Sequence, residues 1–183
     1  MKSSWVLAAL LALPGCARRE PPLPVLGQVP DFQLTAHTGQ PFDRKLLEGR
    51  VWVADFIFTS CGSSCPMMSA KMRQVQSKVS PEVDLVSFTV DPEHDTPPVL
   101  ADYAKRFGAQ PGRWYFLTGD RARLNALSFD TFKLNSVDGS LTHSTRFVLV
   151  DRRGRIRGYY GTVDDQGLGD LLRDIGRLER EPA

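Results

Sequence analysis

Two cysteines four residues apart form the most reactive pair in this sequence. Cys61 and Cys65 lie between an apolar run and Pro66, a residue that suits the first turn of a helix. The start of a helix presents unpaired backbone N–H groups and a positive dipole end, which favour a thiolate over a thiol. Residues four apart on a helix have Cα atoms about 6 Å apart, within the range of about 4.4 to 6.8 Å that a disulfide accepts. The pair can therefore be a redox dithiol or two ligands of one soft metal ion.

The three histidines of the chain are the candidates for a third ligand. His37 lies beside a predicted hairpin turn, where we expect a solvent-exposed side chain without a role. His94 follows a predicted central strand, at the sheet edge where α/β proteins place active sites, but we interpret it as an ordinary surface histidine. His143 directly precedes the strand predicted over residues 145–150. Two thiolates and one imidazole suit copper, whereas structural zinc usually takes four protein ligands.

Three methionines follow the second cysteine and offer a further kind of donor. Met67, Met68 and Met72 carry thioethers, which are soft ligands. Methionines at helical spacing are more often packing residues of a core, and we interpret these three in that way.

The first fifteen residues have the pattern of an export signal. A positive start, Met1-Lys2, precedes an apolar run over residues 5–13. This run is too short to cross a hydrocarbon core, which needs about 20 residues, so it indicates a signal segment. It ends in Leu13-Pro14-Gly15-Cys16, which resembles the lipobox of bacterial lipoproteins despite an unusual proline. The alternatives are an uncleaved leader or a cysteine that merely falls there.

The lipobox resemblance implies a domain organisation. Residues 1–15 would be a lipoprotein signal peptide, and residues 16–28 a Pro-rich tether with lipid attached to Cys16. Residues 29–183 would form one globular domain, consistent with 42% hydrophobic and 24% charged residues. We expect a bacterial cell-envelope lipoprotein with its domain in the periplasm or otherwise outside the cytoplasmic membrane. The net charge of +2, with both signs scattered along the chain, argues against a nucleic-acid partner.

Strand and helix patterns alternate along the domain. Strands are predicted over residues 31–34 and 41–43, which form a hairpin, and over 51–58, 84–90, 114–117, 145–150 and 155–160. Helices are predicted over residues 66–79, 96–108, 120–132 and 165–178. This order indicates an α/β fold of the thioredoxin-like class, with a central mixed β-sheet flanked by helices and an N-terminal β-hairpin. In such a fold the loop that carries His143 faces the cysteine turn.

Five motifs in order carry a more specific resemblance. They are Val29-Pro30-Asp31-Phe32, Phe56-Ile57-Phe58-Thr59-Ser60-Cys61 with Cys65-Pro66, Val90-Asp91-Pro92-Glu93-His94-Asp95-Thr96-Pro97, Phe116-Leu117-Thr118-Gly119, and Thr142-His143 with Leu149-Val150-Asp151 and Gly154. Together they resemble the Sco/SenC family of copper chaperones over about residues 29–178. The chain departs from the family pattern at Gly62, where the family usually has proline after the first cysteine.

This resemblance implies a function and a ligand set. Cys61, Cys65 and His143 would bind a copper ion, as Cu(I), Cu(II) or both, for delivery to the CuA site of cytochrome c oxidase. The partners would be the copper-bearing oxidase subunit or another copper chaperone, together with the membrane through the lipid anchor.

Two enzymatic alternatives use the same cysteines. Cys61 and Cys65 could be a redox-active pair that closes into a disulfide, in a thiol–disulfide oxidoreductase that reduces the oxidase subunit or senses redox state. The wide cysteine spacing argues against this as the sole role. A peroxidase of the same fold resembles a Pro-x-x-x-Thr-x-x-Cys signature, but Ala54 and Phe58 stand at the required positions before Cys61, and Phe58 and Gly62 before Cys65. A metallochaperone is the reading that we prefer.

Overall fold

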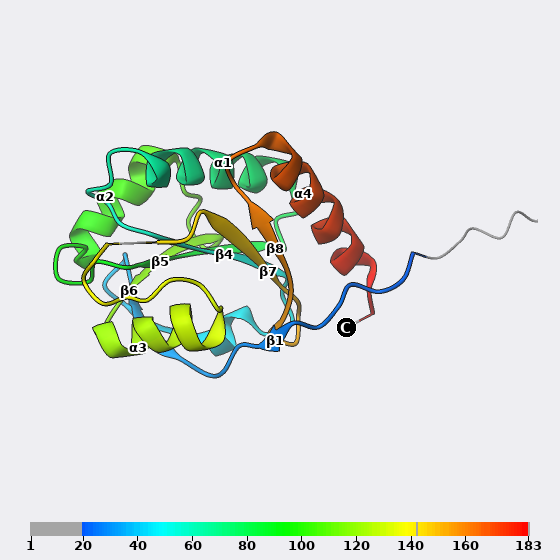
Figure 1. The fold of residues 1–183 in the computed structure, drawn as a ribbon, viewed down its shortest axis with the longest axis horizontal. Coiled ribbons are helices and arrows are strands. Elements are labelled where there is room, and N and C mark those ends of the chain that lie inside the picture. Colours follow the sequence, from blue (N-terminus) through cyan, green and yellow to red (C-terminus); the bar gives the residue numbers. More distant parts are fainter. Residues whose placement is uncertain (1–19, 142, 183) are drawn as a thin grey trace, which may run out of the picture.

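A mixed β-sheet runs through the middle of the structure, a computed structural model that describes residues 20–141 and 143–182 (Figure 1). The strands are β1 (Gly27–Gln28), β2 (Gln33–Ala36), β3 (Pro41–Asp43), β4 (Trp52–Ile57), β5 (Asp84–Thr89), β6 (Trp114–Thr118), β7 (Arg146–Val150) and β8 (Arg155–Gly161). The helices are α1 (Ser64–Lys78), α2 (Pro97–Phe107), α3 (Arg121–Asn125) and α4 (Asp165–Arg180), with a 3₁₀ turn at Arg44–Leu47 and a π-helical turn at Ala126–Thr131.

The strand order is β1-β8-β7-β4-β5-β6-β2-β3. β4, β5 and β6 are parallel, whereas β7 pairs antiparallel with β4. All six residues of β4 are buried, as the near-continuous apolar run predicted for a strand covered on both faces. The helices α1, α2 and α4 lie on one side of the sheet and α3 on the other (Figure 1). The predicted mixed sheet, its flanking helices and the hairpin β2–β3 are confirmed.

Helix ends follow the sequence signals with one exception. α2 begins after Thr96 and ends at Gly108, which adopts a left-handed conformation with φ of 68°. The helix predicted over residues 120–132, however, is α3 followed by the π-helical turn. There the Asn125 side chain accepts a hydrogen bond from the backbone of Val137, and Ser128 donates to the carbonyl of Asn135. These bonds to residues beyond the helix stabilise the wider, π-helical turn, and the sequence of the helix itself does not predict them.

The segment expected as a free tether lies partly on the domain. β1 pairs with the start of β8, and the buried Arg157 guanidinium donates to the carbonyl oxygens of Leu23 and Pro24. The folded part therefore extends back beyond the expected boundary at residue 29. The predicted signal peptide and Cys16 lie outside the described residues. Within the described part, no helix combines the length and the apolar character needed to cross a membrane.

Asp55 is an exception in the core. It lies on β4 with no exposed surface, opposite Ser87 of β5, and neither carboxyl oxygen has a hydrogen-bond partner. Burial raises its pKa to about 7, which the nearby Ser87 hydroxyl offsets only in part. A buried, unpaired carboxylate is costly, so β4 carries a group that destabilises the fold when charged.

We predict that Asp55→Asn removes a pH-dependent loss of stability. Between about pH 4 and pH 7 the unfolded chain releases this proton while the folded chain keeps it, so the free energy of unfolding falls as pH rises and then levels off. The pKa rise from 3.8 to about 7 corresponds to about 4 kcal/mol. In chemical unfolding at several pH values, the free energy of unfolding of the variant relative to that of the wild type should increase up to about pH 7. Asp102→Asn, at an exposed position on α2, is the control and should not reproduce the trend.

Candidate metal centre

The turn between β4 and α1 brings the two cysteines together. Cys61 is partly exposed in the turn, whereas Cys65 is fully buried in the first turn of α1. The backbone N–H of Cys65 donates to Cys61 Sγ at 3.4 Å, and the backbone N–H of Phe58 donates to Cys65 Sγ at 3.4 Å. Both are free thiols in this structure. Backbone N–H groups at a strand end and a helix start thus face both sulfur atoms, as the sequence pattern predicts.

His143 reaches the same point from the loop before β7. Its Nε2 lies 3.1 Å from Cys65 Sγ and 3.1 Å from the Ser64 hydroxyl. Its Nδ1 lies 3.2 Å from the carbonyl oxygen of Ser144. A carbonyl can only accept, so in the neutral ring Nδ1 carries the proton and Nε2 has the free lone pair. The loop therefore turns the ligating nitrogen of the imidazole toward the sulfur atoms.

The three side chains meet the requirements of one metal ion. Sγ of Cys61, Sγ of Cys65 and a ring nitrogen of His143 all lie within 4.8 Å of one another. Two sulfurs and an imidazole form a soft donor set that suits copper. Met68 and Met72 of α1 are fully buried in the core, so these two are packing residues as expected, whereas Met67 is only partly buried.

The two thiols have opposite electrostatic surroundings. Burial raises the pKa of Cys61, but hydrogen bonds from backbone and side-chain groups of Cys65, Ser63 and Ser64 outweigh it and bring the pKa to about 6. Burial raises the pKa of Cys65 far above that of a free thiol; the Phe58 N–H opposes this rise, while the charges of Cys61 and Asp55 add to it. Cys61 is therefore the cysteine of the pair that ionises first, and Cys65 keeps its proton.

The other two histidines take different places. His37 is half-buried rather than solvent-exposed, because its Nδ1 accepts a hydrogen bond from the backbone of Phe116 at 3.2 Å; burial lowers its pKa. The expectation of a solvent-exposed side chain is therefore wrong. This imidazole connects the β2–β3 hairpin to β6. The His94 side chain is 55% exposed and its Nδ1 lies 3.0 Å from Asp95 Oδ1, an interaction that raises its pKa.

Asp95 is a residue that sequence reasoning did not single out. It is fully buried in the connection between β5 and α2 and accepts hydrogen bonds from the backbone and hydroxyl of Thr59 and from the hydroxyl of Thr89. It thereby ties the segment after β5 to the start of the cysteine turn. Its position after a predicted central strand could have identified it, because the carboxyl ends of parallel strands meet at one sheet edge, where functional side chains gather.

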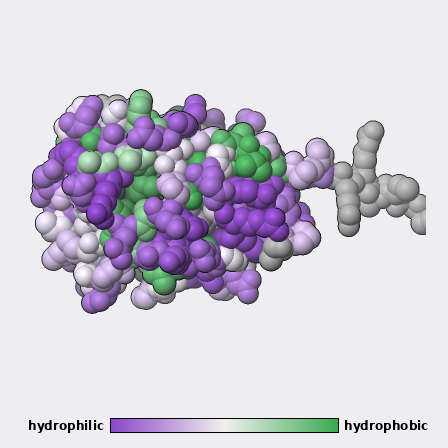
Figure 2. All heavy atoms as spheres, turned by 90° about the horizontal axis from the view of Figure 1, so that it is seen from below, coloured by the Kyte–Doolittle hydropathy of each residue, from purple (hydrophilic) through white to green (hydrophobic). Residues whose placement is uncertain are grey.

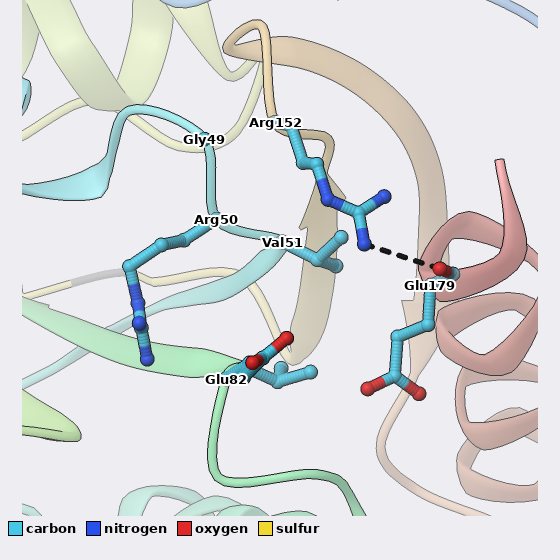
Figure 3. A pocket seen from close by; sticks show the side chains of 7 residues that line it. Gly49, Arg50, Val51, Glu82, Arg152 and Glu179 are labelled. Carbon is cyan, nitrogen blue, oxygen red and sulfur yellow. Dashed lines mark hydrogen bonds between the residues drawn. The ribbon is translucent and has the colours of Figure 1, made fainter. Parts of the chain in front are cut away.

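A cavity of about 270 Å³ lies away from this centre (Figure 3). It is lined by Gly49, Arg50, Val51, Glu82, Val83, Arg152 and Glu179. Val51 directly precedes β4, so the cavity lies at the opposite end of that strand from the cysteines. Its Arg152 donates to carbonyl oxygens at the end of α4, including that of Glu179. Such bonds satisfy the last carbonyls of a helix, so we assign this arginine to helix capping.

Comparisons with known proteins point to one family. A sequence profile described as SCO1/SenC matches residues 26–177. A SCO1/SenC family lipoprotein from Bacillus anthracis is 34% identical, with 84% of this chain and 96% of that chain covered and a TM-score of 0.77. BsSco, a member of the Sco family of cytochrome c oxidase assembly proteins with a disulfide switch, is 30% identical, with 87% and 98% covered and a TM-score of 0.77. ScoI from Bradyrhizobium japonicum, solved with copper bound, is 26% identical, with 79% and 97% covered and a TM-score of 0.61. These likenesses confirm the thioredoxin-like α/β fold.

We predict that Cys61 is alkylated well before Cys65. The rate of reaction with iodoacetamide should rise with pH around a midpoint of about 6, because the thiolate is the nucleophile. Mass spectrometry of peptides after brief exposure to iodoacetamide measures the modification of each cysteine. Cys65→Ala should keep the reactive thiol with a higher midpoint, because one of its hydrogen bonds is lost. Equal modification of both cysteines in the folded wild type would contradict this asymmetry.

Proposed function

Because this chain belongs to the SCO1/SenC family, we propose that it binds one copper ion through Cys61, Cys65 and His143 and passes it to cytochrome c oxidase. The observation that carries the proposal is the convergence of two thiol sulfurs and one correctly turned imidazole within 4.8 Å. A relative that is 26% identical was solved with copper bound. The acceptor would be the copper-bearing oxidase subunit at its CuA site, or an intermediate copper chaperone.

Transfer would proceed by ligand exchange, and the two cysteines would have different parts in it. Cys61 is partly exposed and has the lower pKa, so its sulfur is the one that an acceptor cysteine can replace first. Cys65 and His143 hold the ion from the buried side, where the Phe58 N–H supports the Cys65 sulfur. Stepwise replacement of one sulfur at a time keeps the soft ion bound throughout.

A second candidate function is thiol–disulfide exchange. The specific observation in its favour is the pairing of an exposed, low-pKa Cys61 with a buried, high-pKa Cys65, which is the division expected of an attacking and a resolving thiol. The relative BsSco is described as carrying a disulfide switch. In this function Cys61 would attack a disulfide of the oxidase subunit, and Cys65 would then displace the reduced partner and close the Cys61–Cys65 disulfide.

The proposed location is the outer side of a bacterial membrane, with lipid attached to Cys16. The lipobox-like residues 13–16 support it, and a relative that is 34% identical is a lipoprotein. The described chain begins at residue 20, close to Cys16 in sequence, and β1 fixes the following residues against β8. The folded domain would therefore stand close to the membrane.

We predict one tightly bound copper per reduced chain, and weaker binding after Cys61→Ala, Cys65→Ala or His143→Ala. Loss of either thiolate should weaken Cu(I) binding by at least about 100-fold, and loss of the imidazole by about tenfold or more. Competition with a chromophoric Cu(I) chelator measures each affinity. His37→Gln, which keeps an acceptor for the Phe116 N–H, is the control and should bind as the wild type does. If reduced wild type binds no copper, the chaperone function is wrong and thiol–disulfide exchange remains.

We predict that Cys16→Ser moves the chain from the membrane fraction to the soluble fraction of a bacterial host. Lipid on Cys16 would be the main attachment, because a chain with several acyl groups holds far better than one with a single group. Incorporation of radiolabelled palmitate and fractionation measure the two effects. Lys2→Ser leaves the acceptor cysteine in place and should still give labelled protein. Membrane association that persists without label would show that another segment is the anchor.

A further inference from the structure

The buried carboxylate of Asp95 fixes the ring of His94. Asp95 is fully buried and accepts from the Thr59 hydroxyl, the Thr59 N–H and the Thr89 hydroxyl. Its Oδ1 also lies 3.0 Å from His94 Nδ1. An ionised carboxylate only accepts hydrogen bonds, so Nδ1 of this histidine must carry a proton. In the neutral ring the free lone pair is then on Nε2.

This arrangement is the one that metal-binding histidines usually have. A ligating imidazole commonly donates its other N–H to a carboxylate or a carbonyl, which fixes the tautomer and raises the basicity of the ligating nitrogen. His143 has a carbonyl partner of this kind, and His94 has a carboxylate. Unlike His143, the His94 side chain is 55% exposed. It can therefore meet an incoming ion without movement of the domain.

The position of His94 links it to the cysteine turn. β4 and β5 are neighbouring parallel strands, so the cysteine turn and the segment with His94 emerge at the same sheet edge. The Thr59 hydroxyl lies 3.4 Å from His94 Nδ1 and donates to Asp95, and Thr59 is two residues before Cys61. His94 is not part of the three-residue cluster whose ligand atoms lie within 4.8 Å of one another. It would therefore bind an ion before or after that cluster does.

The local charge also favours a cation. The segment around His94 carries Asp91, Glu93 and Asp95, and Asp91 and Asp95 both act on the imidazole. Glu93 is paired with Arg121 on α3, whereas the charges of Asp91 and Asp95 act on the imidazole. Two carboxylates beside an imidazole form a site that attracts a positive ion to the mouth of the metal centre.

We propose that His94 is a further copper-binding position, an entry ligand that receives the ion and passes it to Cys61. The step is a ligand exchange: the bond from copper to His94 Nε2 breaks as the bond to Cys61 Sγ forms. The oxidation state of copper does not change, and a proton released from a thiol goes to solvent. This inference rests on the proposed copper-binding function and adds a transient site to it.

The test compares the rate of copper loading with the final affinity. Reduced chain is mixed anaerobically with Cu(I) as its acetonitrile complex, and the absorption of the copper–thiolate bonds is followed by stopped flow. In His94→Gln, loading should be about tenfold slower, with the affinity at equilibrium changed by less than about twofold. His37→Gln is the matched control and should change neither quantity. Since His94 lies at the surface, its replacement leaves the core intact, which far-ultraviolet circular dichroism verifies.

The outcomes separate this inference from the proposed function. Loading of His94→Gln at the wild-type rate, or faster, would overturn the entry-ligand role, because loss of a merely cationic imidazolium would speed the approach of a positive ion. A wild-type chain that takes up no copper would instead overturn the proposed function itself. A second measurement uses Cys61→Ser/Cys65→Ser, which lacks both thiolates. Cu(I) should shift the ring resonances of His94 but not those of His37, and an unshifted His94 would also overturn the inference.

Discussion

The antiparallel pairing of β7 with β4 is the constraint on which the metal centre depends. Trp52 lies opposite Val150 and Ala54 opposite Val148, so the start of β7 and the end of β4 are at the same sheet edge. This pairing brings His143 within 3.1 Å of Cys65, although 78 residues separate them. Backbone hydrogen bonds of a buried sheet are hard to shift by even one position, because a one-residue slip would turn every side chain to the other face.

The opposite end of the sheet holds the first residues of the chain that the structure describes. β1 lies against Arg155 and Ile156 of β8, next to the residues where β4 begins. Arg157 is buried there between Asp151 and Glu181 and also donates to the carbonyls of Leu23 and Pro24. Figure 2 shows hydrophilic side chains gathered toward the right of the molecule, below a hydrophobic patch. The first described residues and the candidate metal centre are thus at opposite ends of β4, so lipid at Cys16, as proposed, would leave the candidate centre facing away from the membrane.

Most elements could be predicted because their signals are local. The apolar run of β4, the proline in the first turn of α1 and the glycine after α2 each act within a few residues. β1 could not be predicted, since a two-residue strand has no pattern of its own and forms only against β8. The π-helical turn also depends on distant partners, such as the bond from Val137 to Asn125.

The candidate site divides in the same way. Cys61 and Cys65 were evident from their spacing, whereas His143 was only one of three histidines until the motif order singled it out. The orientation of each imidazole depends on what its second nitrogen contacts: Ser144 for His143, Asp95 for His94 and the Phe116 backbone for His37. Those contacts are set by tertiary structure, so the sequence could supply the candidates but not their tautomers.

One asymmetry within the cysteine turn connects copper binding and redox chemistry. Cys61 is stabilised as a thiolate by hydrogen bonds at its end of the turn, while burial and the charges of Cys61 and Asp55 oppose ionisation of Cys65. A copper ion reverses this balance, because a positive charge between the two sulfurs favours both thiolates. A disulfide carries no charge on either sulfur, so it also avoids the repulsion between two thiolates. When Asp55 on β4 is ionised, above its pKa of about 7, its charge raises the free-energy cost of the empty dithiol with both sulfurs ionised, relative to the metal-bound and oxidised forms. This bias follows from the charge itself, and it holds whichever of the two chemistries the chain performs.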